Sequence, residues 1–225
     1  IEPALPLLES KGHKVYVHSQ TYKKPNQSAG TKEEKLGALH DLYQNSEIKA
    51  VWAAGGGNRA LHLLDDINYA LLKKNPKPII GFSDTTALLN AFYKKADIKG
   101  LHAPVLSKLP GHKHAEHTFG VLNGKKYDLP LNECQIIKPG KAEGKLIGGN
   151  LSVFINLIHT LYKPKDFKGH ILFLEDCNEE YSHLDRKLLY MRSAGVFENC
   201  EGLILGDFSG LKDTGRPYGF SLQDM

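Results

Sequence analysis

The amino-acid sequence predicts an α/β protein, with a doubly wound parallel sheet in an N-terminal domain and a smaller, C-terminally incomplete α/β domain after it. Three observations lead to this prediction. Short apolar segments alternate with helical patterns through the first hundred residues, with brief connections between them. Glycine-rich or polar stretches follow several apolar segments, as is typical of the carboxyl ends of parallel strands. A change of composition after residue 105 separates two such regions.

The N-terminal pattern predicts each element in turn. Short apolar segments bounded by turn residues indicate strands, whereas apolar residues spaced three and four apart indicate helices. We therefore expect a helix over 3–10, a strand over 14–18, a helix over 32–44, a strand over 50–53, helices over 59–64 and 69–74, a strand over 78–82 and a helix over 85–95.

Residues 106–142 are rich in Gly, Pro, Lys and His and have little helical periodicity, which predicts a linker. The linker separates an N-terminal domain over 1–105 from a C-terminal domain over 143–225. In the second domain we expect an opening segment over 144–150, a helix over 151–161, a strand over 170–174, a helix over 184–193 and a strand over 203–208.

The composition excludes several classes of protein. Hydrophobic residues make up 41% of the 225 residues and charged residues 24%, as in ordinary globular proteins. The net charge of +4 comes from scattered lysines, so neither a nucleic-acid surface nor a membrane partner is predicted. No apolar run approaches the roughly 20 residues of a membrane span. Three widely spaced cysteines favour a reducing compartment over a disulfide framework.

Ser83 occupies the most informative position. It follows the predicted strand over 78–82 and precedes a predicted helix, so its hydroxyl would stand at the edge of a sheet beside helix N–H groups. That placement suits a nucleophile, but a serine before a helix is also a favoured N-cap. The motif lacks the second glycine of a complete elbow, since Thr85 stands there. Both interpretations stay open on spacing alone.

Two further strand ends carry candidate residues. The run Gly55-Gly56-Gly57 follows the strand over 50–53 and would allow close backbone approach to an oxyanion or a phosphate, or would simply form a tight turn. Glu175 and Asp176 follow the strand over 170–174, where a carboxylate could orient a histidine or cap a turn. The glycine pattern matches no nucleotide-binding motif.

The 11 histidines yield no metal site. His112, His114 and His117 have a suggestive spacing, but only Glu116 offers a carboxylate near them. His102, in a predicted strand after the Ser83 helix, is interpreted as a structural histidine. We therefore predict neither a metal nor another cofactor.

Six segments together resemble the LD-carboxypeptidase family of serine peptidases, which includes muropeptide LD-carboxypeptidases and microcin C immunity peptidases. One of them contains the elbow Gly81-Phe82-Ser83-Asp84. The matching segments cover 48–59, 75–88, 102–104, 138–144, 148–152 and 172–176. The resemblance therefore extends over nearly the whole chain.

This resemblance implies a Ser-Glu-His triad without a cofactor. Ser83 matches the nucleophile and Glu175 the glutamate. The implied oxyanion donors are the backbone N–H of Asp84 and that of Gly56 or Gly57.

The chain departs from the family pattern at two places. Gly57-Asn58 replaces an aromatic part of the family's glycine loop, which affects the expected substrate contacts there. No histidine occurs in 210–225, so the catalytic histidine is expected beyond Met225. The family's first strand is likewise expected before Ile1. The resemblance thus identifies the chain as an internal portion of a longer family member.

The implied activity is that of a cytoplasmic serine carboxypeptidase, acting as a homodimer on muropeptides. It would hydrolyse the amide between an L-configured centre and a terminal D-amino acid during recycling of the cell wall. Two alternatives stay open. The enzyme could instead cleave a peptidyl-nucleotide antibiotic, as the microcin C immunity branch does, or the chain could be a binding fragment that is inactive because it lacks the histidine.

Overall fold

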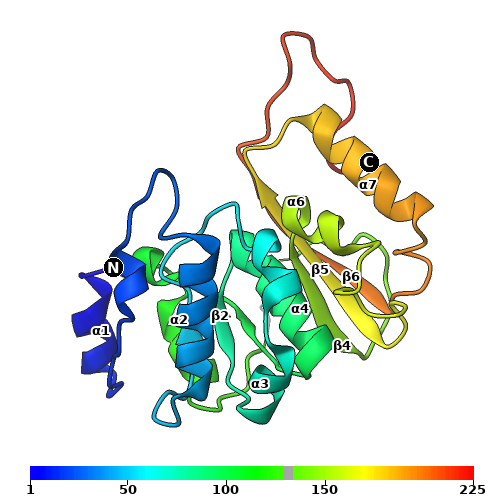
Figure 1. The fold of residues 1–225 in the computed structure, drawn as a ribbon. Coiled ribbons are helices and arrows are strands. Elements are labelled where there is room, and N and C mark those ends of the chain that lie inside the picture. The colour runs from blue at the N-terminus through cyan, green and yellow to red at the C-terminus, as the bar shows by residue number, and fades with distance from the viewer. Residues whose placement is uncertain (129–133) are drawn as a thin grey trace. The chain divides into compact units, whose positions relative to one another are not determined.

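The computed structural model describes residues 1–128 and 134–225, which fold into two compact units, Ile1–Lys141 and Ala142–Met225 (Figure 1). Each unit contains a three-stranded parallel sheet with helices. The predicted α/β class with parallel sheets is therefore confirmed. Parallel strands require a crossover between them, and the helical segments between the strands supply it.

The sheet of the first unit consists of β1 (Val51–Trp52), β2 (Ile79–Gly81) and β3 (Leu101–His102), in that order. β2 is the central strand, and all three of its residues are buried. Val51 pairs with Ile79, and Gly81 pairs with His102. Because all strands run the same way, the residues after β1 and after β2 meet at one edge of the sheet.

The helices of this unit are α1 (Ala4–Ser10), α2 (Lys32–Gln44), α3 (Tyr69–Lys74), α4 (Thr86–Ala96) and α5 (Ala115–Leu122), with 3₁₀ helices η1 (Ser19–Tyr22), η2 (Leu61–Asp66), η3 (Ser83–Thr85) and η4 (Leu106–Lys108). η2 and α3 join β1 to β2, and η3 and α4 join β2 to β3. α2 begins with a capping box, in which Thr31 and Glu34 each bond the other's backbone N–H. α4 ends at Asp97, whose left-handed backbone stops the helix.

Two segments differ from the expectation. Residues 14–18 form no strand, so that prediction is wrong; alternating side chains specify which residues share a face but not whether a partner strand lies within hydrogen-bonding distance. Part of the expected linker over 106–142 is helical, because η4 and α5 bury apolar side chains against α1. That core cluster comprises Ala4, Leu8, Leu106, Leu109, Ala115 and Phe119. Residues 129–133 of the expected linker lie outside the described residues.

A buried lysine ties the end of α2 to the sheet. Lys77, two residues before β2, is 7% exposed, and its Nζ donates to the carbonyl oxygens of Leu42, Tyr43 and Asn45 at 2.8, 2.8 and 2.6 Å. The last carbonyls of a helix have no partner within the helix, and a positive charge there is favourable. One ammonium group therefore donates to all three carbonyl oxygens, and that of Asn45 also accepts the N–H of Ile48.

Replacing Lys77 with methionine is expected to lower the free energy of unfolding by about 3 kcal/mol, because the carbonyls lose a charged donor while the apolar stem is kept. Urea denaturation measures the change. Lys74→Met, which removes an exposed lysine of α3, is the control and should cost less than about 0.5 kcal/mol. Equal stability of the two variants would contradict the assigned role of Lys77.

The sheet of the second unit consists of β4 (Lys145–Asn150), β5 (His170–Cys177) and β6 (Gly202–Ser209), in that order, with β5 central. Its helices are α6 (Leu151–Phe154), which continues as the 3₁₀ helix η6 (Ile155–Leu157), and α7 (Tyr181–Ser193). The expected helix over 151–161 is thus shorter and changes type along its length. Leu151, Leu172, Leu174 and Leu184 are fully buried and form part of the core of this unit.

Candidate functional site

Ser83 lies at a sharp turn between β2 and the helical segment η3–α4. Its backbone has φ +58°, in the left-handed region that a non-glycine residue adopts only at a cost of roughly 1–2 kcal/mol. Strain of this kind persists where the surrounding structure enforces it, and it is frequent at functional sites. The strand-to-helix turn with a strained serine has the geometry of a nucleophile elbow.

Ser83 is not the N-cap of either helix that follows β2. The N-cap of η3 is Phe82 and that of α4 is Thr85, and neither helix receives a side-chain cap hydrogen bond. The serine stands inside the first turn, with its carbonyl oxygen accepting the N–H of Thr86. Helix capping therefore does not account for a serine at this position.

The glycine loop, Gly55–Gly57, lies against the elbow although it follows a different strand. A Cβ atom placed on Gly56 would stand 3.7 Å from Oγ of Ser83, and one on Gly57 would stand 3.1 Å from Oδ2 of Asp84. The parallel arrangement of β1 and β2 produces this proximity, since both segments follow the carboxyl ends of neighbouring strands. Four of the five candidate residues, Gly56, Gly57, Ser83 and Asp84, thus lie together in the first unit.

Asp84 has a contact that the sequence did not indicate. Its Oδ2 accepts hydrogen bonds from the backbone N–H groups of Arg59 and Ala60, each at 3.0 Å. The family resemblance implied a role in the site only for the backbone N–H of Asp84. An acidic residue directly after an elbow serine, with a glycine loop at the neighbouring strand end, is the pattern that could have suggested the contact.

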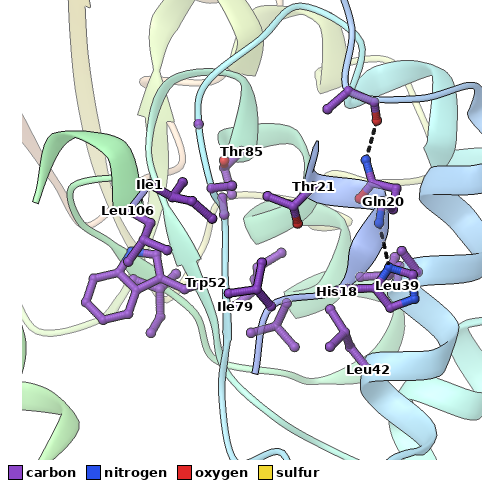
Figure 2. Close-up of a pocket in the computed structure, with 18 of the residues that line it drawn as sticks. Ile1, His18, Gln20, Thr21, Leu39, Leu42, Trp52, Ile79, Thr85 and Leu106 are labelled. Carbon is purple, nitrogen blue, oxygen red and sulfur yellow. Dashed lines mark hydrogen bonds between the residues drawn. The ribbon is translucent and has the colours of Figure 1, made fainter. Parts of the chain in front are cut away.

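A cavity of about 1030 Å³ adjoins the glycine loop in the first unit (Figure 2). Its walls include apolar side chains of α2 and the sheet, among them Leu39, Leu42 and Ile79, and polar groups of η1 and its N-cap. Gln20 donates its backbone N–H to Nδ1 of His18 at 3.1 Å on that polar side. Asp84 and the glycine loop contribute to the walls, whereas Ser83 is not among the described lining residues. The cavity therefore neighbours the serine.

His102 stands beside the elbow on β3. It pairs with Gly81, and its ring meets that of Phe82 edge to face, with centroids 6.4 Å apart. Burial lowers the pKa of His102 to about 4, so the imidazole is neutral near pH 7. A neutral ring packed against Phe82 agrees with the interpretation of His102 as a structural residue.

Glu175, the fifth candidate, belongs to the second unit. It lies near the end of β5, which extends to Cys177 and is therefore longer than the expected strand over 170–174. Burial, together with the charges of Asp176 and Asp207, raises the pKa of Glu175 to about 7, against a hydrogen bond with Asn150 that lowers it. A nearby positive charge would favour the ionised form of this carboxyl group.

The raised pKa of Glu175 has a testable effect on stability. The folded carboxyl binds more protons than the unfolded one between pH 4.5 and about 7, so the free energy of unfolding should fall as the pH rises through this interval. Glu175→Gln removes the titration. Because the Glu175 side chain is partly exposed, the effect is smaller than for a fully buried group. We expect the free energy of unfolding of this variant to exceed that of the parent protein by about 1–2 kcal/mol at pH 8 and to equal it at pH 4. Guanidinium denaturation at both pH values measures the difference, and parallel pH profiles would refute the assignment.

Asp176, next to Glu175, links β5 to residues at the end of β4 and in α6. It is 3% exposed and accepts hydrogen bonds from Nδ2 of Asn150 at 3.0 Å and from N and Oγ of Ser152 at 3.0 and 2.6 Å. Lys187 donates to Oγ of Ser152 at 2.5 Å and pairs with Glu179 at 2.8 Å. Asp176 therefore joins β5 to Asn150 at the end of β4 and to Ser152 in α6.

The histidines of the expected linker lie close together. The ring centroids of His112 and His114 are 5.6 Å apart, and those of His114 and His117 are 5.7 Å apart. Among residues 1–128 and 134–225, no group of three or more His, Cys, Asp or Glu side chains is arranged to hold a metal ion. Within the same residues, no helix has the length and apolar character needed to span a membrane.

Comparisons with known proteins match both units. Residues 1–103 match the LD-carboxypeptidase N-terminal domain and residues 143–225 the LD-carboxypeptidase C-terminal domain. The chain is 30% identical over 232 residues to the "Probable murein peptide carboxypeptidase" of Bacillus subtilis (strain 168), covering 100% of this chain and 72% of that protein. It is 29% identical over 249 residues to the microcin C7 self-immunity protein MccF of Escherichia coli, covering 94% and 72%.

A solved structure agrees with these sequence matches. The muramoyltetrapeptide carboxypeptidase from Oxalobacter formigenes superposes with a TM-score of 0.82 at 26% identity, over 99% of this chain and 77% of that one. The two family matches together account for most of the sequence. The chain therefore belongs to the LD-carboxypeptidase family of peptidases.

Proposed function

We propose that the protein is a serine carboxypeptidase that hydrolyses the amide between an L-configured centre and a terminal D-amino acid of murein peptides. The observation that carries the proposal is the strained elbow at Ser83, with φ +58° and the glycine loop beside its Oγ. A hydroxyl in this position can attack a carbonyl whose oxygen is held by backbone N–H groups. The murein peptide carboxypeptidase relatives support the class of substrate.

In the proposed reaction, Oγ of Ser83 bonds to the carbonyl carbon of the amide and loses its proton to a histidine. The tetrahedral oxyanion accepts hydrogen bonds from the N–H of Asp84 and that of Gly56 or Gly57. The C–N bond then breaks, the histidine returns the proton to the departing amine, and water hydrolyses the resulting ester. Glu175 would orient that histidine and stabilise its charge, as the family resemblance implies.

Incubation of the natural full-length polypeptide with a synthetic murein tetrapeptide tests this function. Mass spectrometry should detect release of the terminal D-alanine, and an analogue that ends in L-alanine should stay intact. A parallel arm contains an aminoacyl sulfamoyl nucleoside, because MccF, a relative, is known in complex with such compounds. Cleavage of the nucleoside compound alone would overturn the murein assignment in favour of the immunity-type activity.

The cytoplasmic location and the homodimer are also proposed here, on the family resemblance alone. Light scattering coupled to gel filtration should give twice the mass of the polypeptide. Cell fractionation should recover the protein with cytoplasmic markers. A monomeric mass at micromolar concentration would exclude the dimer.

A further inference from the structure

The residue after the proposed nucleophile reaches across to the neighbouring strand connection. Asp84 shares the elbow backbone with Ser83, while its Oδ2 accepts the N–H groups of Arg59 and Ala60 at 3.0 Å each. These two N–H groups lie just past the glycine loop, where the chain enters η2. A single carboxylate therefore connects the segment that carries the serine to the segment that carries the proposed oxyanion donors.

The receiving segment lacks a local way to satisfy these groups. Ala60 is the N-cap residue of η2 and has no side-chain oxygen, and η2 receives no side-chain cap hydrogen bond of its own. The N–H of this N-cap residue and that of Arg59 before it point outside the turn and take their acceptor from another segment. Asp84 supplies that acceptor from a position 24 residues further along the chain, so the entry to η2 and the elbow become one structural unit.

The glycine loop is fixed on its N-terminal side, where Ala54 accepts the backbone N–H of Ser107 at 2.9 Å. The three glycines that follow are exposed and have the largest backbone freedom of any residues. A Cβ atom on Gly57 would stand 3.1 Å from Oδ2 of Asp84. A Cβ atom on Gly56 would stand 3.7 Å from Oγ of Ser83. The consecutive residues 83 and 84 thus face the consecutive residues 56 and 57.

From this arrangement we infer that the Asp84 side chain is a positioning residue: its carboxylate clamps the end of the glycine loop and so holds the loop's N–H groups at the oxyanion formed by attack of Ser83. This inference rests on the proposed function. In this role the carboxylate acts through its hydrogen bonds to the backbone of Arg59 and Ala60. Loss of these bonds would let the loop's N–H groups shift, and a displacement of about 1 Å at a catalytic group can cost 10²-fold in rate.

Kinetics of Asp84→Ala and Asp84→Asn test the clamp. Alanine removes both hydrogen bonds, so kcat for D-alanine release should fall about 10- to 100-fold while KM changes less than about threefold. Asparagine keeps an oxygen acceptor, so it should restore kcat to within about fivefold of the parent protein. Glu9→Ala, which removes an exposed carboxylate of α1, should leave both constants unchanged.

A variant on the donor side keeps the test decisive if Asp84→Ala does not fold. Ala60→Pro removes one of the two N–H donors at a position whose φ of −64° proline can adopt. We expect a smaller loss of kcat than in Asp84→Ala, again without a matching rise in KM. Unchanged kcat in folded Asp84→Ala, equal damage by asparagine and alanine, or unchanged kcat in Ala60→Pro would each overturn the inference.

The Ser83→Ala variant separates this inference from the proposed function. If Ser83→Ala is inactive and Asp84→Ala is fully active, only the clamp is refuted. If Ser83→Ala retains normal turnover, the proposed nucleophile is wrong whatever the Asp84 variants do.

Discussion

Replacing Ser83 with alanine is expected to reduce kcat by at least about 10³-fold, because the attacking hydroxyl is lost while the surrounding donors remain. The thermal midpoint should stay close to that of the parent protein, since alanine at φ +58° bears nearly the same backbone strain as serine. Release of D-alanine from a murein tetrapeptide measures the activity, and thermal denaturation measures the stability.

Ser83→Gly provides the matched control for strain. Glycine adopts the left-handed region without the cost borne by other residues, so this variant should be inactive yet more stable than the parent by about 1 kcal/mol. Loss of activity with a gain in stability would mark a residue retained for chemistry. Near-normal turnover in either variant would rule out Ser83 as the nucleophile.

Replacing Gly148 with alanine is expected to have the largest effect on stability. Gly148 has φ +124°, and a Cβ there would stand 1.9 Å from the backbone oxygen of Phe173, its partner in β5. Phe173 cannot retreat easily, because β5 is the central strand and pairs with β6 on its other side. A clash with fixed backbone, added to the strained φ, should cost more than about 4 kcal/mol and could prevent the second unit from folding.

Gly169→Ala is the control for this prediction. Gly169 also has a positive φ of +76°, but in the described part of the chain no atom beyond its two neighbours in sequence lies within 4 Å of where its Cβ would be. That variant should lose only the strain energy, about 1–2 kcal/mol. Guanidinium denaturation compares the two variants, and soluble yield identifies a variant that does not fold. Equal stability of Gly148→Ala and Gly169→Ala would contradict the role assigned to the strand contact.

Local sequence patterns predicted most helices and strands, because their periodicity depends on which side chains face the core. They failed at residues 14–18, where alternating side chains suit a strand that the structure does not contain. They also ended the strand that carries Glu175 too early, at residue 174, whereas β5 extends to Cys177. Both errors concern where a strand pairs and where it ends, and these depend on hydrogen bonds to a neighbouring strand.

Contacts of charged side chains were the least predictable features. Lys77 resembles an ordinary surface lysine in the sequence, yet it is buried against three carbonyl oxygens at the end of α2. Glu175 and Asp176 form one acidic pair in the sequence, but the structure gives Asp176 four hydrogen bonds in a buried site. Burial and partner choice follow from packing between distant segments, which periodicity does not contain.

The sequence by itself determined the α/β class, the family resemblance and the two strand ends that carry Ser83 and the glycine loop, because strand-to-helix turns have local residue preferences. Only the tertiary structure decided that Ser83 bears a left-handed backbone, that Gly56 and Gly57 lie against the elbow, and that the Asp84 side chain joins the two segments. These features depend on the pairing of β1 with β2, which brings residues more than 20 positions apart within hydrogen-bonding distance.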